Sequence, residues 1–373
     1  MTATRENHRE AVAGRSDVED TAELLAYYED LERLKAGALW TIANKIEPWE
    51  PVSRYSPVLW PYKEMRGHVL RAIDLVTPEK AGRRVIYLNN PGAGDRAACV
   101  GGIYSGLQTM KAGETASAHA HSTSAMRFIM EGKGAYTIVD GHKMTLGAND
   151  LVLTPNGTWH EHGIDPDGTT CIWQDCLDIP LVNSLEANFY AVHPDLHQKV
   201  GYAVDDTKYT FGAPGLQPQV AWDKRYSPLY KYEWGPTYEA LVKYSKVTDG
   251  SPYDGILMNY VNPLNNGPVM LTLGASMQLL RPGEKTKAHR HTGNVIYQVA
   301  KGSGTSIING KRFDWQEKDI FCVPAWMFHE HANGSASDDA CLFAFNDFPV
   351  MNALGLYREE AYGDNGGHQK IEA

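Results

Sequence analysis

The sequence predicts a mainly β protein made of two similar antiparallel units. From Arg83 onward, short apolar or alternating runs are separated by Gly, Asp and Asn turns, which is the strand spacing of an antiparallel sandwich or barrel. The same strand-like sequence pattern resumes at Val269. An internal repeat links the two blocks, and a repeat of this kind indicates a duplicated structural unit.

The repeat preserves residues of different chemistry in a fixed order. The segment Gly113-Glu114-x4-His119-x-His121 recurs 170 residues later as Gly283-Glu284-x4-His289-x-His291. Asp140-Gly141 is a hairpin signal, because both residue types tolerate a positive φ. We expect a hairpin at the corresponding place in the second unit. Further markers recur 169 residues later, with Asn309-Gly310 matching Asp140-Gly141 and His329-Glu-His331 matching His160-Glu-His162.

Helical segments are expected outside the two strand-rich blocks. The apolar spacing predicts helices over 21–40, 63–75, 237–245 and 351–362, the first of them beginning at Thr21. The expected organisation is an N-terminal helical arm (1–82), a first barrel (83–190), a structured connector (191–265), a second barrel (266–350) and a C-terminal helix and tail (351–373).

Composition narrows the functional classes. The 373 residues carry a formal net charge of −10, which argues against nucleic-acid binding because that requires basic surface. The N-terminus has no apolar signal-peptide core, and no run approaches the roughly 18 apolar residues of a membrane helix. The five cysteines form no CxxC pair, so we expect reduced thiols in a cytoplasmic protein without a membrane partner.

The repeated histidines predict metal binding. Two histidines two apart on a strand share one face, and a third from a later strand can converge on them. Imidazole suits Fe, Zn, Cu and Ni, so the ligands alone leave the metal open. The candidate ligands are His119, His121 and His160 in the first unit, and His289, His291 and His329 in the second.

These motifs resemble the two metal-binding motifs of the cupin superfamily, and the resemblance implies a bicupin with two jelly-roll β-barrels. Most metal-binding cupins have a glutamate four residues after the second histidine, where this chain has Ala125 and Val295. A neutral triad leaves about three open positions on a six-coordinate divalent ion. That arrangement suits a substrate that brings an anionic chelate, together with a small gas ligand. It argues against oxalate decarboxylases, which keep the glutamate.

The run HAHSTSAMRFIMEGKGAYTIVDG, with TWHEHG and LDIP further on, resembles the gentisate 1,2-dioxygenase family. The likeness covers about 39–351, and the family includes salicylate, 5-nitrosalicylate and 1-hydroxy-2-naphthoate dioxygenases. It implies one Fe(II) per chain at His119, His121 and His160. It also implies an aromatic 2-hydroxycarboxylate and O2 as substrates. Family members are commonly tetramers, so the resemblance implies a homo-oligomer, specifically a homotetramer.

The same resemblance implies the substrate-binding residues. Arg127 and Arg83 would hold the carboxylate, and His162 would act as acid or base at the phenolic oxygen or at dioxygen. Asp175 would meet a 5-hydroxyl group. The alternatives are a surface salt bridge for Arg127 and a polar wall role for His162. The full substrate-binding set is Arg83, Tyr104, Gly106, Gln108, Arg127, His162 and Asp175, with His162 and Arg127 as the catalytic pair.

The expected reaction opens a 2-hydroxybenzoate between its carboxyl-bearing and hydroxyl-bearing carbons, with gentisate giving maleylpyruvate. Salicylate-cleaving relatives tend to have Trp where Tyr104 stands, which disfavours salicylate. Open alternatives are 5-nitrosalicylate, halosalicylates, salicylate and 1-hydroxy-2-naphthoate. A non-oxidative metal bicupin (an isomerase or decarboxylase) and a non-catalytic binding protein are the other classes. The second triad could hold metal, but Tyr297 replaces Arg127 there, so we expect little turnover.

Overall fold

The computed structural model describes residues 20–371, which divide into two units between Val52 and Ser53. The first unit contains α2 (Ala22–Arg33) and α3 (Leu39–Ile46). Thr21 caps α2 by accepting a hydrogen bond from the backbone N–H of Leu24 at 3.2 Å, which confirms the predicted start. The prediction of one helix over 21–40 is wrong, because Lys35 has a left-handed φ of 54° and ends the helical path.

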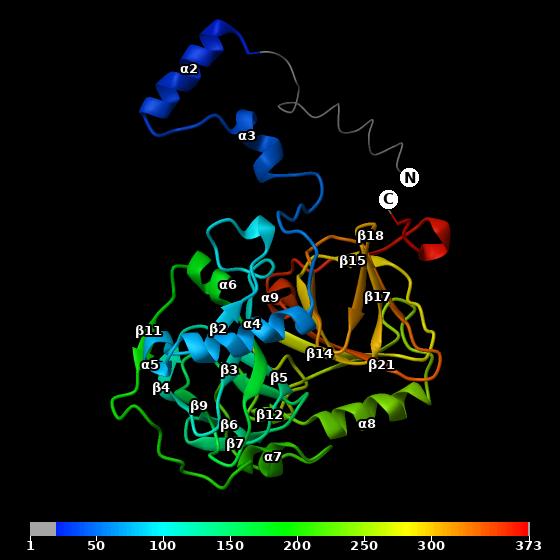
Figure 1. The fold of residues 1–373 in the computed structure, drawn as a ribbon. Helices are drawn as coiled ribbons and strands as arrows, with labels where there is room; N and C mark the ends of the chain where they lie inside the picture. Colours follow the sequence, from blue (N-terminus) through cyan, green and yellow to red (C-terminus); the bar gives the residue numbers. More distant parts are fainter. Residues whose placement is uncertain (1–19, 372–373) are drawn as a thin grey trace. The chain divides into compact units, whose positions relative to one another are not determined.

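The first barrel of the second unit consists of two antiparallel sheets, which occupy the cyan and green part of Figure 1. One sheet has the strand order β12 (Lys231–Tyr232), β8 (Leu151–Thr154), β5 (Ala125–Glu131), β10 (Cys171–Leu177), β3 (Tyr104–Met110) and β2 (Val85–Tyr87). The other has the order β11 (Tyr190–Val192), β4 (Thr115–His121), β9 (His160–Ile164), β6 (Ala135–Val139) and β7 (His142–Leu146).

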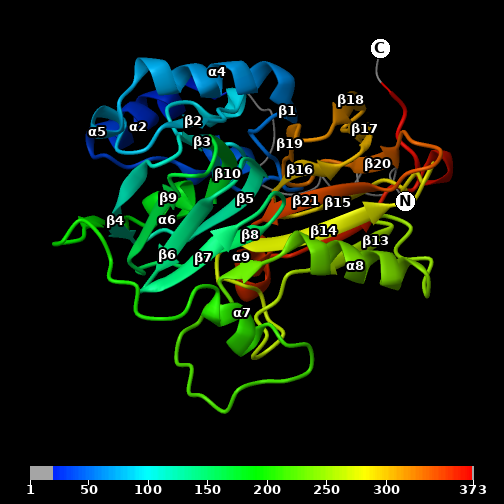
Figure 2. The ribbon, with the colours of Figure 1, turned by 60° about the horizontal axis from the view of Figure 1, so that its bottom comes forward.

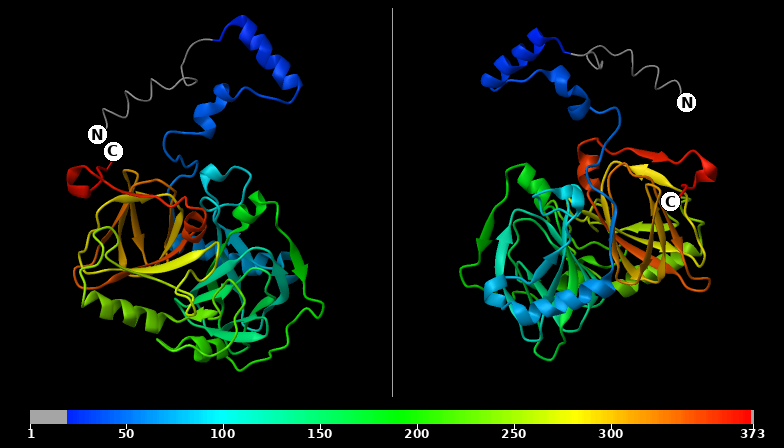
Figure 3. Two further views of the ribbon diagram at one scale, coloured as in Figure 1. Left: turned by 180° about the vertical axis from the view of Figure 1, so that it is seen from behind. Right: turned by 45° about the horizontal axis from the view of Figure 1, so that its top comes forward.

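The second barrel repeats this plan and lies beside the first in both views of Figure 3. Its larger sheet has the order β1 (Val58–Trp60), β19 (Ile320–Val323), β16 (Val295–Lys301), β21 (Ala340–Asn346), β14 (Gly274–Leu280) and β13 (Ile256–Asn259). Its smaller sheet has the order β18 (Lys311–Gln316), β17 (Ser303–Ile308), β20 (His329–Asn333), β15 (His289–His291) and β22 (Glu359–Ala361). The mainly β, two-barrel fold predicted from the sequence is confirmed.

The hairpin predictions are also confirmed. Asp140 and Gly141 connect β6 to β7 with φ values of 46° and 85°, and Asn309 and Gly310 connect β17 to β18 with 48° and 77°. Positive φ at both central residues is the requirement of the two-residue turn that matches strand twist, which is why Asn, Asp and Gly occupy these positions.

Helices flank the barrels, with α4 (Tyr62–Leu75) lying along β3 of the first barrel and α8 (Trp234–Ser245) along β13 and β14 of the second (Figure 2). The predicted helices over 63–75 and 237–245 are confirmed as α4 and α8. The expected helix over 351–362 is wrong in extent, because α9 ends at Ala353 and β22 follows. The helices are α4 (Tyr62–Leu75), α5 (Pro78–Ala81), α6 (Ile179–Ser184), α7 (Asp206–Phe211), α8 (Trp234–Ser245) and α9 (Phe348–Ala353), with 3₁₀ turns at Pro91–Ala93 and Asn365–Gly367.

Strand alternation sends neighbouring residues of β5 to different places. Phe128 packs between the barrels, stacked on Phe343 of β21 with ring centroids 3.8 Å apart. Arg127 and Ile129 face the interior of the first barrel instead. The two larger sheets therefore share one apolar core that spans both barrels. Among the described residues, no helix is long and apolar enough to cross a membrane.

Candidate metal centre and substrate pocket

The three histidines of the first repeat converge inside the first barrel. His119 and His121 come from β4 and His160 from β9, and the register pairs His119 with His160. One ligand atom from each lies within 4.8 Å of those of the other two. All three side chains are buried. Within the described part of the chain, this is the one group of three or more such residues that meets this spacing. The predicted triad can therefore hold a metal ion.

Backbone carbonyls select which nitrogen of each histidine faces the centre. Nδ1 of His119 lies 2.8 Å from the carbonyl oxygen of Ser117, Nδ1 of His121 lies 2.8 Å from that of Thr123, and Nδ1 of His160 lies 3.0 Å from that of Thr158. Each Nδ1 donates, so each Nε2 keeps its lone pair for a ligand bond. Nε2 of His121 and Nε2 of His160 are buried without another partner. The donor set fits a divalent cation.

Burial keeps these imidazoles neutral. Burial, followed by the positive charge of Arg83, lowers the pKa of His119 to about 3. Burial likewise lowers the pKa of His121 to about 4, and it holds the pKa of His160 well below the ordinary value. A neutral imidazole is the form that binds a metal, so the site is prepared at neutral pH without losing protons.

An ion pair stands beside the triad. Arg127 on β5 and Asp175 on β10 are register partners, and Nε of Arg127 lies 2.9 Å from Oδ1 of Asp175. Nη1 of Arg127 also donates to the hydroxyl oxygen of Thr154 at 2.7 Å. Burial lowers the pKa of Arg127 to about 10 while Asp175 opposes the shift, so the cation persists at neutral pH. Arg127 is 1% exposed, so it is not a surface salt bridge.

Several buried polar atoms in this barrel lack hydrogen-bond partners. Both polar side-chain atoms of Gln108 and Nε2 of His162 are among them. Nδ1 of His162 is occupied by the hydroxyl of Thr137 at 2.8 Å. Burial holds the pKa of His162 well below its ordinary value, so the ring is neutral. Orphaned buried groups cost free energy unless a ligand pairs with them. Their position around the triad marks a polar ligand site.

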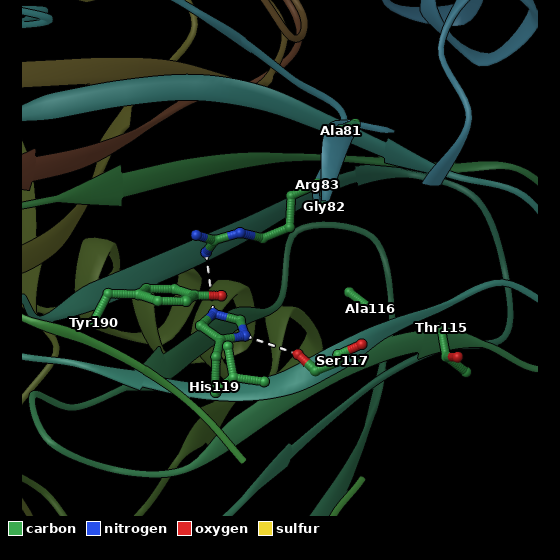
Figure 4. A pocket seen from close by; sticks show the side chains of 9 residues that line it. Ala81, Gly82, Arg83, Thr115, Ala116, Ser117, His119 and Tyr190 are labelled. Atoms are coloured by element: carbon green, nitrogen blue, oxygen red, sulfur yellow. Dashed lines mark hydrogen bonds between the residues drawn. The ribbon is translucent and has the colours of Figure 1, made fainter. Parts of the chain in front are cut away.

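The entrance to this barrel is a cleft of about 430 Å³ lined by Arg83, His119 and Tyr190 (Figure 4). Nη1 of Arg83 lies 3.1 Å from Nε2 of His119, and the ring of Tyr190 stacks on that imidazole with centroids 5.4 Å apart. A smaller pocket shares Arg83 and extends to Gln108. Arg83 therefore reaches the triad from the rim, whereas Arg127 reaches it from within.

Two other predicted pocket residues lie on β3. Tyr104 stacks on Tyr87 with ring centroids 6.4 Å apart, and burial and the charge of Asp175 raise its pKa. Gly106 is paired with Asp175 on one side and Tyr87 on the other. A Cβ atom at Gly106 would come within 2.7 Å of the Val85 side chain, so close approach of β2 requires glycine there.

The second triad has different neighbours. Nδ1 of His289 lies 2.9 Å from Oε1 of Glu359, and Nε2 of His289 lies 3.7 Å from Oδ1 of Asp254. Register places Tyr297 and Ala344 opposite each other, where the first barrel has Arg127 and Asp175. The second barrel thus has carboxylates around its triad and lacks the buried Arg–Asp pair.

Some residues of the site could not be read from the sequence. Trp173 carries a weak signal, because it lies two residues before Asp175 on one strand and so shares its face. Thr137 and Thr154 reach His162 and Arg127 from other strands, and Tyr190 lies on an edge strand that pairs with β4. Those contacts depend on long-range pairing, which no local pattern indicates.

Comparison with known proteins agrees with this architecture. The cupin domain family matches residues 106–179 and 276–345, one match in each barrel. A 5-aminosalicylate 1,2-dioxygenase from Comamonas sp is 39% identical over 355 residues, covering 94% of this chain and 93% of that protein. Gentisate 1,2 dioxygenase 1 from Aquipseudomonas alcaligenes is 34% identical, covering 91% and 96%. The chain belongs to the gentisate 1,2-dioxygenase family.

This member of the gentisate 1,2-dioxygenase family also matches a crystal structure over nearly its whole length. Salicylate 1,2-dioxygenase from Pseudoaminobacter salicylatoxidans, solved as an adduct with gentisate, has a TM-score of 0.87 and 30% identity, covering 95% of this chain and 98% of that chain. The family resemblance, the bicupin fold and the reaction class are therefore confirmed. The protein is a ring-cleaving dioxygenase, an oxidoreductase with a histidine metal site.

Proposed function

We propose that the first barrel binds one Fe(II) per chain and uses O2 to open gentisate between its carboxyl-bearing and hydroxyl-bearing carbons, giving maleylpyruvate. The observation that carries this proposal is the buried pair of Arg127 and Asp175 beside a neutral histidine triad. A neutral triad leaves the metal its full charge, which favours an anionic chelating substrate. Fe(II) supplies the open coordination positions and the electron transfer that allow an aromatic ring to react with dioxygen.

The arginines bind and orient the substrate. Arg127 has a fixed position because Asp175 and Thr154 both hold its guanidinium. A planar guanidinium pairs with a carboxylate through two parallel hydrogen bonds, which sets the direction of the ring. Arg83 now donates toward Nε2 of His119. With His119 holding a metal through Nε2, the guanidinium of Arg83 would be available to the substrate's carboxylate at the rim.

His162 accepts the proton of the phenolic hydroxyl. Its Nδ1 is held by Thr137, so Nε2 is the atom that accepts. A neutral ring with a depressed pKa takes the phenolic proton only when that hydroxyl becomes strongly acidic, as it does next to a cation. Tyr104, Gly106 and Gln108 form the remaining wall of β3 around the ring.

Asp175 favours a hydrogen-bond donor at ring position 5. Its Oδ1 is buried, and its contact with Arg127 is an ion pair without a directed hydrogen bond. A carboxylate accepts from a hydroxyl or amino group and repels a nitro group or a halogen. We therefore rank gentisate above 5-nitrosalicylate and halosalicylates. 5-Aminosalicylate is the second candidate, because a 39% identical relative is a 5-aminosalicylate 1,2-dioxygenase.

The test is oxygen uptake by the Fe(II)-reconstituted protein with a panel of 2-hydroxybenzoates. We expect uptake with gentisate or 5-aminosalicylate and a weaker response with salicylate, 5-nitrosalicylate and 1-hydroxy-2-naphthoate. The ring-opened product, measured by its absorbance, should form in a one-to-one molar ratio to the oxygen consumed. 3-Hydroxybenzoate, which cannot chelate through adjacent oxygens, is the negative control. Absence of uptake with every 2-hydroxybenzoate would remove the proposal.

We further propose a cytoplasmic homotetramer in which the second triad does little turnover. The support for association is the set of half-exposed apolar side chains on the first unit, including Leu25, Leu39 and Trp40. Light scattering of the purified protein measures the assembly directly, and a monomeric mass contradicts it.

A further inference from the structure

We propose that Asp178 and Thr272 position the metal ligand His121, so that the second barrel helps to build the metal site of the first. The inference rests on the proposed function in one respect, namely that the first triad binds the catalytic metal. Neither residue touches the triad. Both act through a single peptide group, and both are therefore positioning residues.

The peptide group between Thr123 and Ser124 connects Asp178 to His121. Its carbonyl oxygen, on Thr123, lies 2.8 Å from Nδ1 of His121 and can accept the Nδ1 proton; the hydroxyl of Thr123 lies at the same distance from Nδ1. Its N–H, on Ser124, donates to Oδ1 of Asp178 at 2.8 Å. A carboxylate at the N–H end polarises the peptide and strengthens the carbonyl as an acceptor. The imidazole thereby becomes a better donor at Nδ1 and a more basic ligand at Nε2.

The carboxylate of Asp178 is committed to this role. Asp178 stands at the start of α6, yet its side chain makes no capping hydrogen bond to that helix. The side chain is 2% exposed, and its backbone N–H donates in turn to the carbonyl oxygen of Ser124 at 3.4 Å. The link between Asp178 and Ser124 is therefore reciprocal, and it prevents the loop after β4 from turning away.

The other oxygen of Asp178 is held by the second barrel. The hydroxyl of Thr272, which lies just before β14, donates a hydrogen bond to Oδ2 of Asp178. Thr272 thus fixes the rotation of a carboxylate whose partner oxygen holds the His121 loop. The first metal site is in this way connected to a residue of the neighbouring barrel by a continuous series of hydrogen bonds.

The second barrel contains a similar arrangement that is closed on itself. Oδ1 of Asp347 accepts from the backbone N–H of Asn294 at 2.7 Å, and the carbonyl oxygen of Gly293 lies 3.2 Å from Nδ1 of His291. Oδ2 of Asp347, however, accepts from the side chain of Asn294 at 2.7 Å, within its own barrel. The carbonyl contact to histidine is 0.4 Å longer than the 2.8 Å of the first barrel. The contact from the other barrel is therefore particular to the first site.

The test measures Co(II) affinity by competition with a chelator, in the full chain carrying His289→Ala and His329→Ala, so that the second barrel keeps one histidine of its triad and the first triad is left intact. We expect Asp178→Ala to weaken Co(II) binding about tenfold, as loss of an outer partner of a metal-binding histidine does. Thr272→Val should weaken it about threefold, and Thr272→Ser, which keeps the hydroxyl, should restore it. Asp347→Ala is the matched control, and we expect Co(II) affinity unchanged.

The outcomes separate this inference from the function on which it rests. Weaker Co(II) binding in Thr272→Val, with rescue by Thr272→Ser and no effect of Asp347→Ala, supports it even if Asp178→Ala does not fold. Equal affinity in Thr272→Val and its parent overturns the positioning role and leaves the metal site intact. Equal loss in Asp347→Ala also overturns it, because the effect is then general. No Co(II) binding by the parent overturns the metal site itself.

Discussion

The two barrels carry the same three histidines in the same strand register, yet they surround them with opposite charges. The first barrel places Arg83 and Arg127 near its triad, with Asp175 as the internal partner. The second places Asp254 and Glu359 around His289. Duplication preserved the ligands, whereas the residues that would receive an anionic substrate occur in one copy. A histidine triad therefore identifies a metal site, and its neighbours determine whether an acidic aromatic substrate can reach it.

The largest expected effect comes from removing one ligand in each barrel. His160→Ala should abolish ring cleavage, by a factor of about a thousand or more, because two histidines cannot hold the metal in place. His329→Ala should retain most of the activity. Metal content per chain and oxygen uptake with gentisate measure both variants. Complete loss of activity in His329→Ala, with metal retained at the first triad, would contradict our assignment of turnover to the first barrel.

Removing the buried cation should have the next largest effect. Arg127→Met should lower kcat/KM about a hundredfold or more, because the substrate loses its partner and Asp175 is left buried without one. Tyr297→Phe in the second barrel should leave kcat/KM unchanged. The double variant Arg127→Met with Asp175→Leu should recover thermal stability without recovering activity. Unchanged apparent affinity for substrate in Arg127→Met would exclude its role as the carboxylate partner.

A feature common to both barrels should give a matched pH effect. Burial raises the pKa of Asp178 to about 6 and that of Asp347 to about 6, from an ordinary value of 3.8. The folded state then binds protons more tightly than the unfolded state. The contribution of each carboxyl to the protein's free energy of unfolding is therefore lost as pH rises from about 4 to 7. For Asp347 the loss is about 3 kcal/mol. In Asp347→Asn, chemical unfolding at pH 4 and pH 7 should show that this part of the dependence has disappeared. An unchanged dependence contradicts the raised pKa.

The smallest expected effect concerns the rim. Register pairs Tyr190 with His121 and Glu359 with His291, so these residues occupy matching positions beside the two triads. Tyr190→Glu should raise KM about three- to tenfold, because a carboxylate near Arg83 repels an anionic substrate, and added salt should reduce the difference. Glu359→Tyr should not change KM. If KM rises in Tyr190→Glu but does not depend on salt, the cause is lost packing on His119 and not charge repulsion.

The sequence predicted features that depend on strand alternation and on the repeat. His119, His121 and His160 could be grouped because an H-x-H pair shares a face and the repeat aligned the third histidine. The hairpins at Asp140-Gly141 and Asn309-Gly310 could be placed because their backbone requires specific residues. The family resemblance assigned Arg127 to the substrate pocket; His121 ends β4, and Arg127 lies on the next strand, β5. It reaches the site because both strands enclose the same interior.

What the sequence could not predict depends on contacts between distant segments. The ion pair of Arg127 with Asp175 requires β5 to lie beside β10, and Thr272 reaches Asp178 only because the barrels pack together. The sequence does not indicate where the expected helix over 21–40 ends, because Lys35 adopts a left-handed backbone conformation that is unusual for lysine. The C-terminal segment forms β22 because β15 offers an unpaired edge, a tertiary effect that overrides local preference.

The strand β1 has a consequence for how this protein can be divided. It precedes the first barrel along the chain, yet Val58, Leu59 and Trp60 pair with β19 of the second barrel. The backbone N–H of Tyr62 then donates to Asp319 of that barrel at 2.7 Å. A fragment containing only the second repeat would therefore expose an open strand edge that is prone to aggregation. The boundaries of the sequence repeat and the boundaries of an independently folding fragment are consequently different, and a stable fragment of the second barrel needs residues from before the first barrel.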